Sequence, residues 1–182
     1  MHEVIRGART MPEMTAANVI EFLAKMETLG IQIWIIGGWG VDALLGEQTR
    51  PHDDLDIVIQ RKDVERACEY LEGRSFRNVP RPDTSTWNFV LGDSLGHEID
   101  FHVIVFDDEG NGIYGPTERG IIYPPAGSLW DDGSITGHKV RCISPEQMVK
   151  DHIGYKVRER DFQDVSALCE KFGIAIPEEY RC

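Results

Sequence analysis

Two aspartates separated by one residue stand in an apolar run that predicts a strand. Side chains two positions apart on a strand point to the same face, so we expect Asp54 and Asp56 to share one face while Leu55 and Ile57 face a core. Two carboxylates on one face repel each other unless a cation lies between them, and Mg²⁺ prefers oxygen ligands of this kind. A polar strand edge would give the same D-x-D pattern, which therefore does not decide the matter alone.

A third carboxylate on another predicted strand strengthens the metal interpretation. The run from residue 97 to 105 alternates, with one face made of Ile99, Phe101, Val103 and Val105 and the other of Glu98, Asp100, His102 and Ile104. Asp100 lies in the middle of its face between large apolar residues, where an unpaired carboxylate is costly. An acid on a solvated face explains Asp100 equally well until the first pair is considered with it. Together the three acids could form a two-metal site.

A glycine pair, Gly37-Gly38, follows one apolar run and precedes a short helical pattern. Glycine at such a junction lets backbone N–H groups approach a phosphate at the positive end of a helix, although a tight turn alone would also require it. Residues 38–43 fit the dinucleotide-binding pattern G-x-G-x-x-A as well. We reject that motif because Gly46 and Pro51 cut the helix short, and because the acids precede the second apolar run instead of following it.

Basic residues near these motifs are candidates for binding phosphates. Lys156, Arg158 and Arg160 cluster near a predicted helix end. There they would either interact with the helix dipole or clamp a triphosphate, and the two interpretations weigh evenly. Arg50 and His52 stand close to the aspartates in sequence and are further phosphate-binding candidates, with an ordinary surface turn as the alternative.

The elements that must position these residues follow from periodicity and from capping signals. We expect a helix that starts after Thr15 and stops at Gly30, and two C-terminal helices capped by Ser144 and Asp161. The other expected helices cover residues 39–45 and 63–72. The C-terminal helices should end at about Val157 and at Phe172, before Gly173. The expected strands are 31–36, 56–59, 86–91, 97–106 and 139–143, with residues 107–137 forming a long excursion that holds short strands.

This order predicts a mixed α/β (α+β) fold. We read residues 1–14 as a flexible leader and 15–182 as a single domain whose helical C-terminal part begins at about residue 144. The leader has neither the apolar core nor the cleavage site of a signal peptide, and no stretch approaches the roughly 18 apolar residues of a membrane helix. The cysteines Cys68, Cys142, Cys169 and Cys182 are scattered, which is typical of reduced thiols in a cytoplasmic protein.

The net charge of −12 argues against a nucleic-acid partner, because such binding depends on Lys and Arg neutralising phosphates. It is compatible with a cationic small molecule, with divalent metal, or simply with solubility. We therefore expect neither nucleic acid nor a membrane as a partner. The sequence leaves open whether the protein is a monomer or a homodimer.

Taken together, the motifs resemble the small antibiotic nucleotidyltransferases of the polymerase-β superfamily. The similarity is strongest to lincosamide nucleotidyltransferases and aminoglycoside 2″-adenylyltransferases, and it spans most of the chain from Ile31 to Phe172. It rests on residues 37–42, 49–56, 98–102, 140–144, 152–155 and 161–165, in that order. The resemblance implies the nucleotidyltransferase fold, a mixed twisted sheet flanked by helices with further helices at the C-terminus. It is much less specific for the substrate.

The resemblance also implies a function. It implies transfer of a nucleoside monophosphate, AMP from ATP, to a hydroxyl of a small antibiotic such as a lincosamide or an aminoglycoside, with release of pyrophosphate. Asp54 and Asp56 would bind Mg²⁺, and Asp100 would complete the triad as the base or by positioning the hydroxyl on a second metal. The nucleotide contacts it implies, together with the candidates above, are Gly37, Gly38, Trp39, Arg50, His52 and Lys156.

The segment from Asp107 to Trp130 matches the family least, and the acceptor pocket is expected there. Pocket walls could come from aromatic residues, of which we expect at least half to pack in the core instead: Trp87, Tyr114, Tyr123 and Trp130. Two alternatives stay open. One is a nucleotidyltransferase that modifies a protein partner, as an antitoxin does, although such chains usually lack a long acceptor excursion. The other is a non-catalytic nucleotide-binding module, which would not require three carboxylates.

Overall fold

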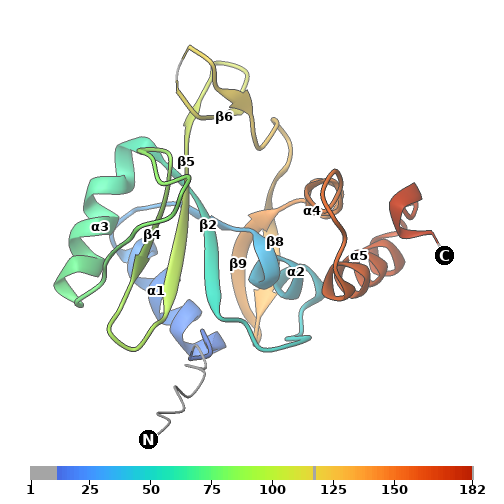
Figure 1. Ribbon diagram of the computed structural model, residues 1–182, viewed down its shortest axis with the longest axis horizontal. Coiled ribbons are helices and arrows are strands. Elements are labelled where there is room, and N and C mark those ends of the chain that lie inside the picture. The colour runs from blue at the N-terminus through green and yellow to red at the C-terminus, as the bar shows by residue number, and fades with distance from the viewer. Residues whose placement is uncertain (1–11, 117, 182) are drawn as a thin grey trace, which may run out of the picture.

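The structure, a computed structural model, describes residues 12–116 and 118–181 and contains one mixed sheet with helices on both sides (Figure 1). The strands are β1 Ile33–Ile35, β2 Asp54–Gln60, β3 Arg77–Val79, β4 Asn88–Gly92, β5 Glu98–Phe106, β6 Gly112–Tyr114, β7 Ile121–Ile122, β8 Leu129–Ile135 and β9 His138–Ile143. Their order across the sheet is β3-β4-β5-β2-β1-β9-β8, with β6 pairing to β5 and β7. The predicted mixed α/β class is therefore confirmed.

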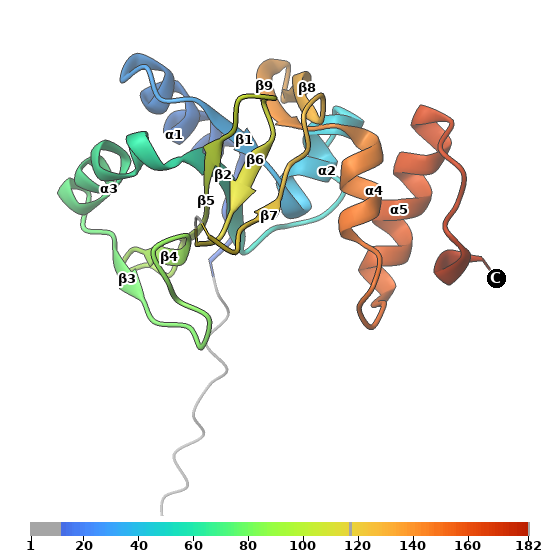
Figure 2. The ribbon, with the colours of Figure 1, turned by 90° about the horizontal axis from the view of Figure 1, so that it is seen from above.

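The helices form two groups on opposite sides of the sheet (Figure 2). They are α1 Ala16–Thr28, α2 Gly37–Leu45, α3 Val64–Gly73, α4 Pro145–Asp151 and α5 Glu159–Phe172, with short 3₁₀ turns η1 Arg61–Asp63 and η2 Glu178–Tyr180. One group is α1 with α3, and the other is α2 with α4 and α5. Thr15 caps α1 as expected, because its side chain accepts a hydrogen bond from the backbone N–H of Asn18.

Two central strands run side by side in the same direction. β2 and β5 are parallel over their full paired length, and β4 forms the predicted antiparallel hairpin with β5. On the other side of β2, strand β1 is antiparallel to β2 and parallel to β9. Leu55, Ile57 and Phe101 are fully buried, so one face of β2 and β5 forms core as the alternation predicts. The opposite face is left for the acids.

The predicted alternation of β5 fails at its end. It holds as far as Val103, but Ile104 is fully buried and Val105 is 51% exposed. From Ile104 onward β5 pairs with β6 in a hairpin that stands away from the body of the sheet (Figure 1). Beyond Val103 the face that carries Ile104 is therefore buried, and the face that carries Val105 is exposed to solvent.

The predicted helix from Ser144 to Val157 is too long. Ser144 caps α4 as expected, but α4 ends at Asp151, and Gly154 in the following loop has a positive φ of 92°. The next helix begins at Glu159 instead of after Asp161. Asp161 lies in its first turn and accepts the backbone N–H of Arg158 at 2.8 Å. These corrections move Lys156 from a helix into a loop.

Two further expectations concern the ends of the chain and membranes. Met14 is buried, its N–H donates to the carbonyl of His52 at 2.7 Å, and its own carbonyl accepts from Trp39 Nε1 at 3.1 Å. Residues 1–11 of the predicted leader, and Cys182, lie outside the described residues. Across the part of the chain that the structure describes, no helix is both long enough and apolar enough to span a membrane.

Candidate active site

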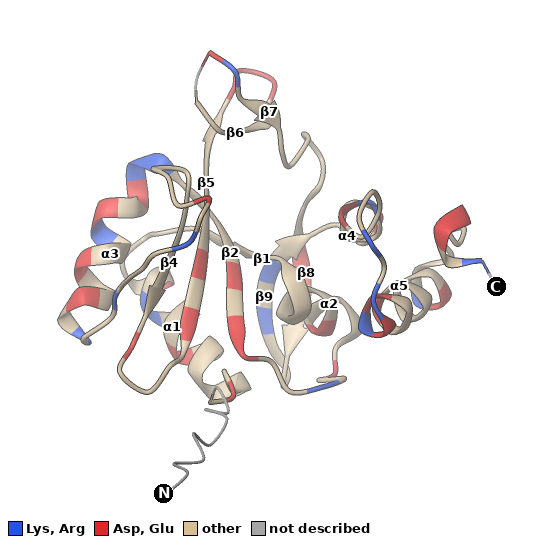
Figure 3. Cartoon of the chain, in the orientation of Figure 1, with Lys and Arg blue, Asp and Glu red and all other residues tan. Residues whose placement is uncertain are grey.

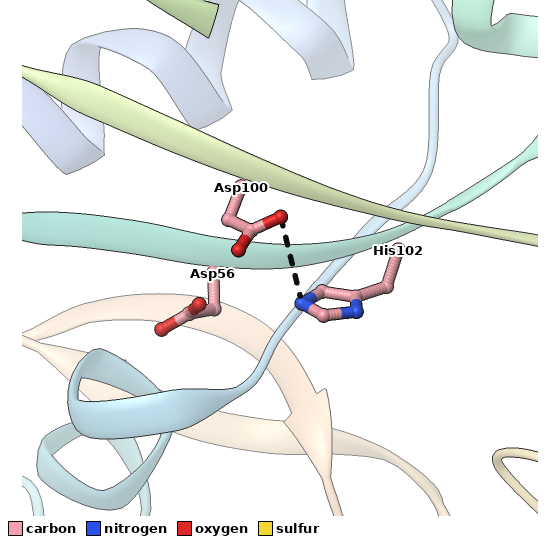
Figure 4. Close-up of side chains that lie close together, drawn as sticks. All are labelled: Asp56, Asp100 and His102. Atoms are coloured by element: carbon pink, nitrogen blue, oxygen red, sulfur yellow. Dashed lines mark ion pairs between the residues drawn. The ribbon is translucent and has the colours of Figure 1, made fainter. Parts of the chain in front are cut away.

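Asp56 and Asp100 lie next to each other on the parallel strands β2 and β5, where the register pairs them directly. Their carboxylates point to the same side of the sheet (Figure 4). Asp54 is one step back along β2 and pairs with Glu98. Figure 3 shows these acids following the two strands where they run together. The three predicted carboxylates are thus brought onto one face.

Crowding of negative charge makes these carboxyl groups hard to ionise. Burial, with the charges of Asp54 and Asp100, raises the pKa of Asp56 to about 7. Burial and the charge of Asp54 raise the pKa of Asp100 to about 6. Burial and neighbouring acids also raise the pKa of Asp54. Carboxyl groups that are buried beside one another in this way would be stabilised in their charged form by a bound cation.

His102 is a member of this group to which the sequence argument gave no role. Its Nε2 lies 3.8 Å from Asp100 Oδ1 (Figure 4). Burial lowers the pKa of His102 to about 4, so its ring is neutral near pH 7. The signal was present in the sequence, because His102 shares the face of Asp100 at a spacing of two residues.

The glycine pair lets three side chains approach the beginning of α2. Gly37 has a φ of +60°, and a Cβ atom there would collide with the Asp56 carboxylate. A Cβ on Gly38 would collide with the His52 ring and lie 2.8 Å from an Arg50 guanidinium nitrogen. Among the described residues no side chain caps α2, so its first backbone N–H groups remain available to an anion beside the acids. The helix start is therefore compatible with a bound phosphate, and the binding of phosphate by the pair stays a prediction.

A buried network holds Arg50 at this helix end. His52 is 3% exposed, its Nε2 lies 2.5 Å from Asp42 Oδ2, and its Nδ1 lies 3.0 Å from a terminal nitrogen of Arg50. Arg50 can only donate, so the ring accepts from Arg50 through Nδ1 and donates to Asp42 through Nε2. The other terminal nitrogen of Arg50 lies 3.4 Å from Asp164 on α5. His52 is therefore placed to orient Arg50 and is itself almost closed to ligands.

Trp39 is one of the predicted nucleotide contacts whose side chain the structure does not bring into the site. The side chain is 2% exposed, and its ring packs against that of His52 at 4.8 Å between centroids. Its indole N–H is used by the carbonyl of Met14. Trp39 thus supports the position of His52 from the core.

Asp54, Asp56 and the start of α2 line a cleft of about 640 Å³ between the sheet and the helices α4 and α5. The positively charged side chains that line it are Arg50, Arg158 and Arg160. Arg158 is paired with Asp161 at 3.1 Å, whereas Arg160 lowers the pKa values of both Asp54 and Asp56 through its charge. Lys156 is exposed in the loop before α5 and is not part of the lining. The structure therefore favours Arg160 over Lys156 as the cation facing the acids.

The excursion after β5 supplies the opposite wall of the cleft. Tyr114 and Tyr123 line it, and the Tyr123 hydroxyl donates to Asp151 of α4 at 2.8 Å. Burial raises the pKa of Asp151. Trp87 and Trp130 pack partly buried against the core instead. Half of the four predicted aromatic wall residues are thus in the cleft.

The sequence matches a described family and curated relatives. The family model for aminoglycoside-2″-adenylyltransferase matches residues 18–168. A lincosamide resistance protein of Staphylococcus haemolyticus is 28% identical over 155 residues, which cover 85% of this chain and 94% of that protein. A 2″-aminoglycoside nucleotidyltransferase of Escherichia coli is 31% identical over 142 residues, which cover 74% of this chain and 71% of that protein.

Solved structures of the same fold agree with these matches. The lincosamide antibiotic adenylyltransferase LnuA, in a lincomycin-bound crystal structure, superposes with a TM-score of 0.76 at 25% identity and covers 90% of this chain and 100% of its own. ANT(2″)-Ia, in complex with adenylyl-2″-tobramycin, gives a TM-score of 0.70 at 24% identity and covers 87% of this chain and 89% of its own. The fold predicted from the motifs is confirmed by these two structures.

Proposed function

The chain belongs to the aminoglycoside-2″-adenylyltransferase family, and from that premise we propose that it transfers AMP from ATP to a hydroxyl of a small antibiotic and releases pyrophosphate. The observation that carries the proposal is the direct pairing of Asp56 with Asp100 beside the uncapped start of α2. That arrangement places carboxylates for a metal and a basic oxygen next to N–H groups for phosphates. A cleft of about 640 Å³ is within the usual range for small ligands.

The donor atoms fit Mg²⁺. Asp100 Oδ1 is buried and has no hydrogen-bond partner among the described residues, so one lone pair of the site is unused. Asp54, Asp56 and Asp100 offer the hard oxygen ligands that Mg²⁺ prefers, and they would hold it. When bound, Mg²⁺ would neutralise negative charge on the triphosphate as the phosphoryl group is transferred.

The chain's own residues account for the remaining chemistry. The N–H groups at the start of α2, with Arg50 and Arg160, bind the phosphates and fix the α-phosphate. Asp100 accepts the proton of the acceptor hydroxyl as its oxygen bonds to the α-phosphorus. The bond from that phosphorus to the bridging oxygen of pyrophosphate breaks, and the pyrophosphate leaves. General-base help of this kind is worth about 10²–10⁴-fold, and positioning supplies much of the rest.

An acceptor with amino groups suits the charge of the cleft. The acidic residues of the lining outnumber its three arginines: they are Asp53, Asp54, Asp56, Asp151, Asp161 and Asp164. Asp151 accepts a hydrogen bond from the hydroxyl of Tyr123, on the wall that the excursion forms, where the acceptor would lie. We therefore place amine-bearing antibiotics, of the aminoglycoside or lincosamide type, first among the acceptors.

The decisive experiment measures pyrophosphate release from Mg²⁺-ATP in the presence of single aminoglycosides and lincosamides. Mass spectrometry of the antibiotic then shows whether one adenylyl group has been added. We expect release to depend on the antibiotic and the product to carry AMP. Label from ATP appearing on a lysate protein instead would favour the protein-modifying alternative, and ATP binding without turnover on any acceptor would favour the non-catalytic one.

A further inference from the structure

The imidazole of His102 faces the carboxylates of the proposed metal site, and this arrangement deepens the proposed function, on which the inference rests. Asp56, Asp100 and His102 each present one ligand atom, and these three atoms lie within 4.8 Å of one another. Figure 4 shows the ring on the same side as both carboxylates, with one nitrogen turned toward Asp100. The group therefore contains a nitrogen donor as well as oxygens.

The distance between His102 and Asp100 fits a shared metal ion better than a hydrogen bond. His102 Nε2 lies 3.8 Å from Asp100 Oδ1, which exceeds the roughly 3.2 Å limit of an N–H···O bond. A metal that binds each atom at about 2.0–2.2 Å can join atoms up to roughly 4.2 Å apart. The same oxygen, Asp100 Oδ1, is the one that is buried without a partner. A metal between the two atoms would use both lone pairs.

On the neighbouring strand, the residue opposite His102 offers no competing ligand atom. His102 pairs in register with Val58 of β2, which is fully buried and carries no donor atom. Tyr114 packs beside the ring at 5.9 Å between centroids, and its hydroxyl donates to Asn88 Oδ1 at 3.0 Å. The ring is thus supported by Tyr114, and one of its nitrogens is directed toward Asp100 (Figure 4).

We propose that His102 supplies a nitrogen ligand to the metal ion held by Asp56 and Asp100, so that this position binds Mn²⁺ or Co²⁺ more tightly than Mg²⁺. Mg²⁺ prefers oxygen ligands, whereas divalent transition metals also accept an imidazole nitrogen, with an affinity that rises from Mn²⁺ to Co²⁺. The position formed by Asp54 and Asp56 has only oxygen donors and keeps the ordinary preference for Mg²⁺. The site therefore has two metal positions of different chemical character.

Mn²⁺ binding to the whole chain, measured by electron paramagnetic resonance without nucleotide, tests the proposal. Pulsed spectra should show coupling of bound Mn²⁺ to ¹⁴N. His102→Asn should lose that coupling and bind Mn²⁺ about tenfold more weakly, with less than about a threefold change for Mg²⁺. His97→Asn is the matched control, because His97 stands just before the same strand but is bonded to Asp93 at 2.8 Å and lies outside the cleft. It should behave as the wild type.

Bound Mn²⁺ without ¹⁴N coupling in the wild type would overturn the proposal even if His102→Asn failed to fold. Unchanged Mn²⁺ affinity in a folded His102→Asn variant would overturn it as well. These readouts do not require catalysis. If the protein shows the coupling but transfers no AMP, the proposed function is wrong and the assignment of His102 as a metal ligand stands. If the protein transfers AMP without the coupling, the proposed function stands and the assignment of His102 is wrong.

Discussion

Asp56 and Asp100 are register partners on the parallel strands β2 and β5, and each carboxyl group has a pKa above its ordinary range. Asp100 contributes directly to the shift of Asp56 through its charge. The two residues are therefore a single electrostatic unit, and changing either one should alter metal binding, proton transfer and stability in ways that can be separated.

Replacing Asp100 by Asn removes the proposed base and leaves the start of α2 and the arginines in place. We expect turnover to fall by about 10²–10⁴-fold while ATP still binds. Turnover is measured as pyrophosphate release and binding by calorimetry. Glu98→Gln is the matched control, because Glu98 lies two residues earlier on the same strand and pairs with Arg81. Near-wild-type transfer by Asp100→Asn would show that another group takes the proton.

Asp56 should destabilise the metal-free protein as pH rises. Its pKa in the folded protein is about 7, against about 3.9 for an unfolded aspartate. The folded state thus binds the proton of Asp56 more tightly than the unfolded state does. The stabilisation that protonated Asp56 gives to the folded protein is complete below about pH 4 and is lost as pH rises through about 7. Asp56→Asn removes the charge and should raise the unfolding free energy at pH 8 by about 1–2 kcal/mol, or the Tm by about 2–8 °C.

The measurement is the Tm of both proteins with EDTA from pH 5 to pH 8. The wild type should lose stability across this range more steeply than Asp56→Asn. Added Mg²⁺ should then stabilise the wild type and leave the variant nearly unchanged. Parallel curves for the two proteins would contradict the assignment of the raised pKa to Asp56.

Gly38→Ala should weaken ATP binding through crowding alone. Its methyl group would collide with the His52 ring and press on Arg50. We expect KM for ATP to rise about tenfold or more, together with a loss of about 1–3 kcal/mol of stability. Gly73→Ala is the control, since Gly73 lies in α3 with no atom within 4 Å of the added Cβ. An equal loss of ATP affinity in both variants would mean that the effect is not local.

His52 should act on ATP only through Arg50. His52→Asn removes the acceptor that orients Arg50, so KM for ATP should rise about tenfold with a smaller change in kcat. In an Arg50→Ala background the same change should add little, because contacting residues are not additive. Circular dichroism checks that both variants fold. Fully additive effects in the double variant would show that His52 has an independent role.

Variants of Arg160 and Lys156 distinguish the phosphate contact that the structure favours from the one that the sequence predicted. Arg160→Ala should raise KM for ATP roughly 10–100-fold, since a hydrogen bond to a charged group contributes about 1.5–3 kcal/mol. Lys156→Ala should leave KM nearly unchanged, because Lys156 is exposed outside the cleft. A larger rise in KM for ATP in Lys156→Ala than in Arg160→Ala would show that Lys156 contacts the phosphates.

Local rules were enough to find the strands that carry Asp56 and Asp100, because strand parity depends only on neighbouring residues, although β2 begins at Asp54, two residues before the predicted strand. They could not give the end of α4, which depends on Gly154 adopting a left-handed conformation. Because the helix was predicted to end at about Val157, Lys156 was placed in a helix instead of a loop. Nor could they show that Trp39 packs on His52, a contact set by the tertiary fold. His102 was in the correct parity but gained meaning only once Asp56 was known to lie opposite Asp100.

The excursion after β5 has a consequence for how such proteins diverge. It contributes Tyr114 and Tyr123 to the cleft, yet β6 pairs with β5 only beyond Asp100 and His102, from Ile104 onward. Insertions or substitutions there leave the pairing of Asp56 with Asp100 undisturbed. Changes confined to this stretch can thus reshape one wall of the cleft without moving the strands that carry the acids.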